Sequence, residues 1–266
     1  MLTNATKLKG LSIQAKDGEL GTVEHFYFDD ETWGVRYLVV NTGGWLSGRD
    51  VLISPLSINH ADWPAKRLHL NLTKQQVKES PGIETHLPIS RRHEAEYMGY
   101  YGYPYYWGGA SLWGASWSPA GLITEPPLTA GERLARTRRE SIDSHLHSSA
   151  AVIGYDIEAQ DGEIGHLDGF LVDDESWAIR YLEIATRNWW PGKKLLLSPG
   201  WIEQISWQDS RVCAGLTRDA IRTCPEYTDS MPIDREYEDR IFLHYGKPPY
   251  WLHDASRKSA LALIGA

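Results

Sequence analysis

Two acidic triplets are the first residues whose types and spacing suggest chemistry. Asp29-Asp30-Glu31 and Asp173-Asp174-Glu175 each gather three carboxylates, which can bind Ca²⁺ or act as a general acid and base. A calcium loop, however, supplies its oxygens at alternating positions, and a catalytic pair of carboxylates must face across a cleft. Neighbouring acids in a turn point in different directions. The sequence therefore favours two strand turns whose acids bond their own backbone.

Two arginines stand inside expected strands, each directly before Tyr-Leu. Arg36 and Arg180 are suited either to a structural ion pair or to clamping a ligand, because the planar guanidinium binds a carboxylate through two nitrogens. The presence of an arginine at both positions favours the structural pair. We expect its partner to be Asp17 or Asp29 in the first half and the corresponding acid, such as Asp161, in the second.

Histidines and catalytic motifs give a weaker signal. His145-x-His147 has no equivalent elsewhere in the chain, and His93-Glu94 lacks the second histidine of a helical zinc motif. The sequence contains no glycine-rich phosphate loop, nucleophile elbow or Cys–His arrangement. We therefore expect no metal, no cofactor and no enzymatic activity, with an enzyme kept as a third alternative.

An aromatic tail from Tyr100 to Trp107 is the strongest functional candidate. Its rings lie among Gly and Pro, so no regular amphipathic face is expected. One alternative is that the tail folds back and seals its own barrel or the partner barrel. The other is an exposed patch for a protein or a sugar, in which case Trp113 and Trp117, just beyond the tail, are the residues with the least assured burial.

The elements that position these residues occur twice, 144 positions apart and without a gap. Asp17-Gly18-Glu19 recurs as Asp161-Gly162-Glu163, and the match continues to Tyr106-Trp107 and Tyr250-Trp251. This is the pattern of a duplicated domain rather than of a short-repeat solenoid. Features present in both copies are expected to build the domain. Features that differ are candidates for function, among them the loop with Trp45 in one copy and Trp189-Trp190 in the other.

Each copy is expected to consist of short antiparallel strands followed by one short helix. Asp-Gly turns separate alternating runs such as 11–15 and 19–28, and Thr73-Lys74-Gln75-Gln76 has the form of a helix capping box. Short strands joined by tight turns indicate a small barrel or sandwich, and barrel closure would remove exposed sheet edges. The segment 108–149 reads as a linker, with helix favoured over 129–147. The expected boundaries are 1–107 for the first domain, 108–149 for the linker, 150–253 for the second domain and 254–266 for a C-terminal tail.

Composition restricts the function classes. The net charge of −8 argues against a nucleic-acid partner, although Arg133 to Arg139 form a local basic stretch. No apolar run approaches the length of a membrane span or a signal peptide, and the two cysteines are not shared between the copies, so a cytoplasmic protein with reduced thiols is expected. The chain has 12 Trp and 14 Tyr but only 4 Phe, which favours contact surfaces.

Both copies resemble one known family. The pattern Gly-x-x-Ile-x-Ala-x-Asp-Gly-Glu-Leu/Ile-Gly, an acidic turn, Trp-x-Val/Ile-Arg-Tyr-Leu and a strand closed by Ser-Pro is similar to the PRC-barrel domain of the photosynthetic reaction-centre H subunit and of the ribosome maturation factor RimM. The stretch from Arg91 to Trp107 resembles a tail of bacterial tandem PRC-barrel proteins. The resemblance covers about 8–107 and 152–251. It implies two PRC-like β-barrels with no shared catalytic centre.

The sequence thus predicts a mainly β chain of two PRC-like barrels, each followed by a short helix and an aromatic tail, in a pseudo-twofold tandem. The predicted function is a non-catalytic protein-interaction or assembly module, whose partner is another protein or a second copy of the chain. The alternative is a small-ligand or carbohydrate-binding protein that uses an aromatic cleft between the domains. The candidate interaction surface comprises Trp45, Trp189, Trp190, Tyr101, Tyr105, Tyr106, Trp107, Trp113 and Trp117.

Overall fold

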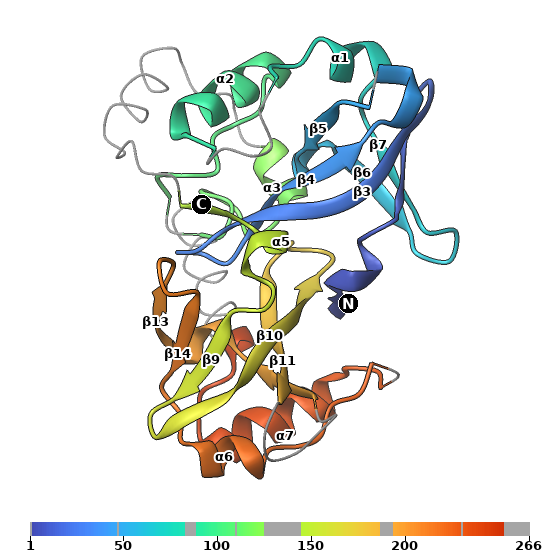
Figure 1. Ribbon diagram of the computed structural model, residues 1–266. Coiled ribbons are helices and arrows are strands. Elements are labelled where there is room, and N and C mark those ends of the chain that lie inside the picture. Colours follow the sequence, from blue (N-terminus) through green and yellow to red (C-terminus); the bar gives the residue numbers. More distant parts are fainter. Residues whose placement is uncertain are drawn as a thin grey trace, which may run out of the picture. The chain divides into compact units, whose positions relative to one another are not determined.

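The computed structural model describes residues 2–46, 48–82, 89–109, 111–124, 145–186, 194–229 and 231–252 (Figure 1). The chain divides into two compact units. Unit 1 comprises essentially Thr3–Ala151 together with Asp173–Ile179, and unit 2 comprises Val152–Val172 and Arg180–Ala266. Two short elements, β1 (Leu2–Asn4) and α5 (Ser149–Val152), have residues in both.

Unit 1 is built on one sheet with the strand order β5-β4-β3-β2-β7-β6. Its strands are β2 (Ser12–Ala15), β3 (Gly18–Asp29), β4 (Val35–Asn41), β5 (Asp50–Ile53), β6 (Ile58–Asp62) and β7 (Arg67–Leu70). Neighbouring strands are antiparallel except for the parallel pair β2 and β7. Alternate side chains such as Ile13, Tyr37 and Leu68 are fully buried and form the core. The apolar residues at alternate positions of the predicted strands are thus the residues that form this core.

The long strand β3 contains a glycine at the point where it lies closest to β4. Its first half pairs with β2 and its second half with β4, which Figure 1 draws as its neighbour. A Cβ atom at Gly21, where φ is +148°, would lie 1.9 Å from the carbonyl oxygen of Asn41. Gly165, the equivalent residue in unit 2, faces Ala185 in the same way at 2.1 Å. The glycine in the repeated Asp-Gly-Glu-x-Gly motif therefore permits the close approach of two strands.

Two helices follow the strands of unit 1. Helix α1 (Lys74–Lys78) begins at the predicted capping box, in which Thr73 and Gln76 bond each other's backbone. Helix α2 (Arg91–Tyr101) is not predicted by the sequence, which places Tyr100 and Tyr101 in an irregular tail. It is capped by Ser90 and ends at Gly102 in the left-handed conformation, with φ of +70°. Tyr100 and Tyr101 are therefore helical, contrary to the sequence prediction.

The segment after the tail continues to pack within unit 1. Bridges between Ser111 and Gly114 and between Trp113 and Ser116 form a tight double turn, and α3 (Pro119–Ile123) follows. Strand β8 (Leu146–Ser148) pairs with β3, which corrects the expectation of helix at these residues. The local helical preference is overridden there by pairing to a sheet edge. Residues 129–144 of the predicted helix and the predicted C-terminal tail from 254 lie outside the described residues.

Unit 2 repeats the sheet of unit 1, with the order β12-β11-β10-β9-β14-β13. Its strands are β9 (Asp156–Ala159), β10 (Gly162–Asp173), β11 (Ile179–Thr186), β12 (Lys194–Leu197), β13 (Ile202–Ser206) and β14 (Arg211–Ala214). The parallel pair β9 and β14 corresponds to β2 and β7. Helices α6 (Arg218–Arg222) and α7 (Arg235–Tyr245) correspond to α1 and α2. Short 3-10 helices occur at η1 (Ala5–Lys7), η2 (Gly43–Leu46), η3 (Pro55–Ser57) and η4 (Pro199–Trp201).

The expectation of a mainly β fold with two β domains is confirmed. In unit 1, no pairing joins β5 to β6 among the described residues, so the sheet path is open there. Closure of either sheet into a barrel therefore stays a prediction.

Candidate functional site

Helix α2 carries a buried carboxylate into the interior of unit 1. Glu94 is only 2 % exposed, and its Oε1 accepts hydrogen bonds from the hydroxyls of Tyr37, at 3.2 Å, and Tyr106. Its Oε2 accepts from Nη1 of Arg91 at 2.8 Å. Burial raises the pKa of Glu94 to about 7, against the opposing effects of Arg91 and the Tyr106 hydroxyl. Burial also raises the pKa of both tyrosines, so their hydroxyls stay protonated and donate.

Arg36 lies beside this carboxylate and is held between two aromatic rings. Its Cζ is 4.0 Å from the ring centroid of Tyr106 and 4.7 Å from that of Trp113. Nη2 donates to Oγ1 of Thr32 at 2.7 Å and lies 3.7 Å from Oδ2 of Asp29. A Cβ atom at Gly34 would lie 2.8 Å from Cζ, so the glycine leaves room for the guanidinium. Asp29, one of the two acids considered from the sequence, is the carboxylate partner.

The predicted pairing of Arg36 with Asp17 is not formed. Asp17 instead accepts a hydrogen bond from the backbone nitrogen of Lys74, at the start of α1, at 2.8 Å. Asp161 does the same for Arg218 at the start of α6, at 2.6 Å. A carboxylate at a helix N-terminus satisfies a backbone donor that has no partner within the helix. These repeated acids therefore serve the Asp-Gly turn and the helix that follows each sheet.

Unit 2 contains the same Arg–Glu–Tyr–Tyr arrangement. Glu238 accepts from the hydroxyls of Tyr181, at 3.0 Å, and Tyr250, at 2.7 Å, and pairs with Arg235 at 3.1 Å. Arg180 stacks on Tyr250 with Cζ 4.1 Å from the ring centroid. Because both units keep these contacts, we interpret them as part of how each unit is built. Trp113 has no aromatic counterpart, since the equivalent position is Arg257.

A cavity of about 280 Å³ opens beside Arg36 in unit 1. Its lining consists of ionisable side chains (Asp29, Glu31, Arg36, Arg91, His145), two aromatic rings (Tyr106, Trp107) and the small residues Thr32, Gly108, Gly109 and Ser111. Gly109 allows the wall to form, because a Cβ atom there would lie 2.3 Å from the backbone of Gly114. The cavity thus combines two guanidinium groups with an aromatic wall.

A second hollow, which we call the tyrosine groove, has a volume of about 410 Å³ in unit 1. It is lined by Tyr100, Tyr101, Tyr103, Leu56, Leu72, Ile123, Asn71 and Gln76, none of which is charged. Tyr100 and Ile123 are 40 % and 45 % exposed, which is unusual for large apolar side chains. The hydroxyl of Tyr100 donates to the carbonyl of Gln76 at 2.8 Å, which fixes its ring at the edge of the groove.

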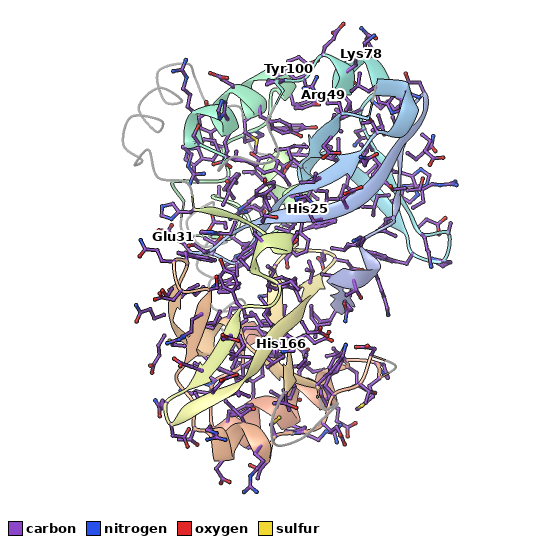
Figure 2. The ribbon with its side chains drawn as sticks, in the orientation of Figure 1. His25, Glu31, Arg49, Lys78, Tyr100 and His166 are labelled. Carbon is purple, nitrogen blue, oxygen red and sulfur yellow. The ribbon has the colours of Figure 1, made fainter. Side chains whose placement is uncertain are left out.

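The tyrosine groove differs from the same place in unit 2. Tyr103 corresponds to Lys247, and Leu56 corresponds to Gly200. Figure 2 shows Tyr100 near Lys78 of α1, well apart from Glu31 at the turn after β3. The tyrosine groove and the arginine-lined cavity are therefore separate features of unit 1.

Of the two alternatives for the aromatic tail, the exposed patch is wrong for its main residues. Tyr105, Tyr106, Trp107 and Trp113 are all buried, and Trp113 has no exposed surface. The rings of Tyr105 and Trp107 stack at 4.3 Å, while Nε1 of Trp113 donates to the carbonyl of Ser176, which also belongs to unit 1. Contacts with arginine and with other aromatic rings stabilise these side chains more than exposure to water would. The alternative in which the tail folds back describes them correctly.

The remaining predicted aromatic residues have different environments. Tyr101 is half-buried and lines the tyrosine groove, and Trp117 is half-buried. Trp45 is half-buried, donates to the carbonyl of Leu20 and lies 4.6 Å below Nζ of Lys74. Trp189 and Trp190 fall outside the described residues.

The sequence does not predict several residues of the buried ion pairs, the tyrosine groove and the histidine contacts. The spacing Arg91–Glu94, repeated as Arg235–Glu238, was a usable signal for the buried ion pairs. Ile123 gave no signal, because it reaches the tyrosine groove from a segment that reads as a linker. His147 contacts Asp30 at 3.0 Å and His145 lies 3.6 Å from Glu31, a pairing that only the β3–β8 ladder brings about.

Metal-binding clusters and membrane-spanning helices are both absent from the described residues. No cluster of three or more His, Cys, Asp or Glu side chains has an arrangement able to hold a metal ion there. No helix in this part of the chain combines the length and apolar character that crossing a membrane requires.

Comparison with known proteins agrees with the fold of unit 1. No curated protein matches the chain. A family model does match at residues 3–77, a stretch that runs from β1 through all the sheet strands β2 to β7 and into α1. Residues 3–77 form a PRC-barrel domain.

Proposed function

We propose that the chain is a non-catalytic protein-interaction module built from two PRC-barrel domains, in which the tyrosine groove binds a segment of a partner protein. The PRC-barrel match at residues 3–77 supports the first domain, and the sequence repeat supports the second. The observation that carries the proposal is the exposure of Tyr100 and Ile123 at the edge of an uncharged hollow. Apolar surface of this kind, bordered by polar groups, marks contact sites.

The lining of the tyrosine groove specifies the chemistry of the partner segment. Tyrosine rings present flat apolar faces together with hydroxyl groups, and Asn71 and Gln76 add amide groups at the edge. No charged side chain is available to neutralise a charged partner. Grooves lined by aromatic residues bind extended proline-containing segments, whose conformation is ordered before binding. An uncharged, extended segment with proline and aliphatic residues is the ligand that this surface fits.

Selection from a library of random displayed peptides tests this directly. We expect the wild-type protein to enrich uncharged sequences with proline or aliphatic residues. The double variant Tyr100→Ser, Ile123→Ser should bind the selected peptides at least about tenfold more weakly, because both exposed contacts are removed. Leu243→Ser is the matched control, since Leu243 lies on α7 of unit 2 and is 83 % exposed. Equal binding by the double variant, or enrichment of charged peptides, would contradict the proposal.

A further inference from the structure

The arginine-lined cavity of unit 1 has hydrogen-bonding capacity that no described residue uses. Arg36 is 1 % exposed, and its Nε and Nη1 have no hydrogen-bond partner among the described residues. Within the described part of the chain, Nη2 alone has polar partners, which are Thr32 and Asp29. A buried guanidinium group normally has its donors satisfied, since an unpaired donor is costly. Nε and Nη1 of Arg36 can therefore donate to a hydrogen-bond acceptor that enters the cavity.

The acids already present do not supply that acceptor. Oδ1 of Asp29 accepts from the backbone nitrogens of Glu31 and Thr32 and from the Thr32 hydroxyl. Glu94 already accepts from Arg91, Tyr37 and Tyr106 and does not line the cavity. Glu31 is 66 % exposed and is within 3.6 Å of His145 at the cavity's edge. The acceptor therefore has to enter the cavity from outside this set.

The charges around the cavity limit how negative an entering group can be. Arg36 and Arg91 attract an anion, whereas Asp29, Glu31 and Glu94 carry or share negative charge nearby. The two guanidinium groups attract a ligand with one negative charge, whereas the nearby carboxylates would repel a second negative charge on that ligand. A carboxylate is planar and matches the donors of a guanidinium. The rings of Tyr106 and Trp107 provide a wall for an apolar body.

We propose that this cavity binds a small organic molecule through a single carboxylate, which accepts hydrogen bonds from Arg36 and lies in the field of Arg91. The volume of about 280 Å³ is at the lower end of ligand pockets, so the body is of the size of one aromatic ring or a short aliphatic chain. The site is independent of the tyrosine groove. It gives the first PRC-barrel domain a ligand as well as a contact surface.

Calorimetric titration of the full chain with benzoate, at constant ionic strength, tests the proposal. We expect saturable binding of one benzoate per chain. Benzamide, which has the same shape without the charge, and inorganic phosphate, with its higher charge, should not bind. N-acetyl-alanyl-phenylalanine with a free or an amidated C-terminus separates a small molecule from a chain terminus as the source of the carboxylate. Equal binding of benzoate and benzamide would show that the cavity does not recognise the carboxylate, and no saturation by about 10 mM benzoate would show that only water occupies it. Either result overturns the proposal.

Three variants locate the binding. Arg36→Gln should weaken benzoate binding at least about tenfold, as expected for a lost hydrogen bond to a charged group. Glu31→Gln should strengthen it about threefold, because an exposed negative charge at the edge is removed. Glu175→Gln, the equivalent change in the second copy, does not line the cavity and should have no effect. If Arg36→Gln fails to fold by circular dichroism, the difference between Glu31→Gln and Glu175→Gln decides, and its absence sinks the assignment.

Discussion

Glu94 places a carboxylate where water is largely excluded, and its protonation therefore affects the stability of unit 1. Its three donors are Arg91, Tyr37 and Tyr106. Burial raises the pKa of Glu94 to about 7, so the folded chain keeps a proton that the unfolded chain releases near pH 4.5. The resulting stabilisation is complete below the unfolded pKa and is lost as the pH rises through about 7.

Replacing Glu94 by Gln should remove this pH dependence. Between pH 4.5 and 7 the unfolding free energy of the wild type is expected to fall by up to about 1.4 kcal/mol per pH unit from this one group, and Glu94→Gln should flatten that slope. Urea unfolding at pH 5, 6, 7 and 8, followed by tryptophan fluorescence, measures it. Glu96→Gln, on the exposed side of the same helix, is the control. Identical slopes for the two variants would show that the buried carboxylate does not titrate in this range.

Residue types alone indicated part of this chemistry and concealed the rest. The repeated Arg36 and Arg180 suggested structural ion pairs, and the structure gives Arg36 a carboxylate neighbour in Asp29. The aromatic neighbours Tyr106 and Trp113 could not be foreseen, because they come from positions 70 and more residues later in the chain. Stacking of a cation on a ring leaves no pattern in the local sequence.

At the scale of elements, local periodicity predicted the strands better than the helices. Strands β2 and β3 follow from alternation and an Asp-Gly turn, and α1 follows from its capping box. Helix α2 was missed because its buried face carries Arg91 and Glu94, so that the apolar stripe of a typical helix is interrupted. Tyr37, one of the donors to Glu94, lies on β4, and the tertiary structure brings the two residues together.

The close approach of Gly21 in β3 to β4 provides a prediction at the scale of a single element. Gly21→Ala would place a methyl group 1.9 Å from a backbone oxygen of β4, at a φ of +148° that alanine disfavours. We expect a loss of at least about 3 kcal/mol in the unfolding free energy of unit 1. Gly44→Ala is the control, since nothing lies within 4 Å of that position, and it should change the value little. Equal stability of the two variants in urea unfolding would show that β3 can move away from β4 at no cost.

At the scale of the whole molecule, the sequence repeat distinguishes contacts that both units share from residues in which they differ. The buried glutamate with two tyrosine donors and an arginine occurs in both units. The tyrosine groove has residues that unit 2 replaces, such as Tyr103 by Lys247. Among the aromatic residues predicted as a contact surface, Tyr105, Tyr106 and Trp107 are buried, whereas Tyr101 lines the tyrosine groove. Burial depends on the packing of both α2 and the segment 111–124, and the second of these has no repeat.

The two copies of the ion pair should differ in strength, because they differ in exposure. The side chain of Arg91 is 10 % exposed beside Glu94, whereas that of Arg235 is 55 % exposed beside Glu238. Removing one partner of a buried pair leaves an uncompensated charge, so Arg91→Gln should cost about 3 kcal/mol of unfolding free energy. Water screens the second pair, and Arg235→Gln should cost about 1 kcal/mol or less.

Urea unfolding at pH 8, above the pKa of about 7 of Glu94, compares these variants with Arg92→Gln. Arg92 is 87 % exposed and pairs with Glu96 on the outer side of α2, so its loss should be close to zero. The expected order of destabilisation is Arg91, then Arg235, then Arg92. Equal losses for Arg91→Gln and Arg235→Gln would mean that the shared hydrogen bonds of the network, rather than the exposure of the arginine, set the stability of both units.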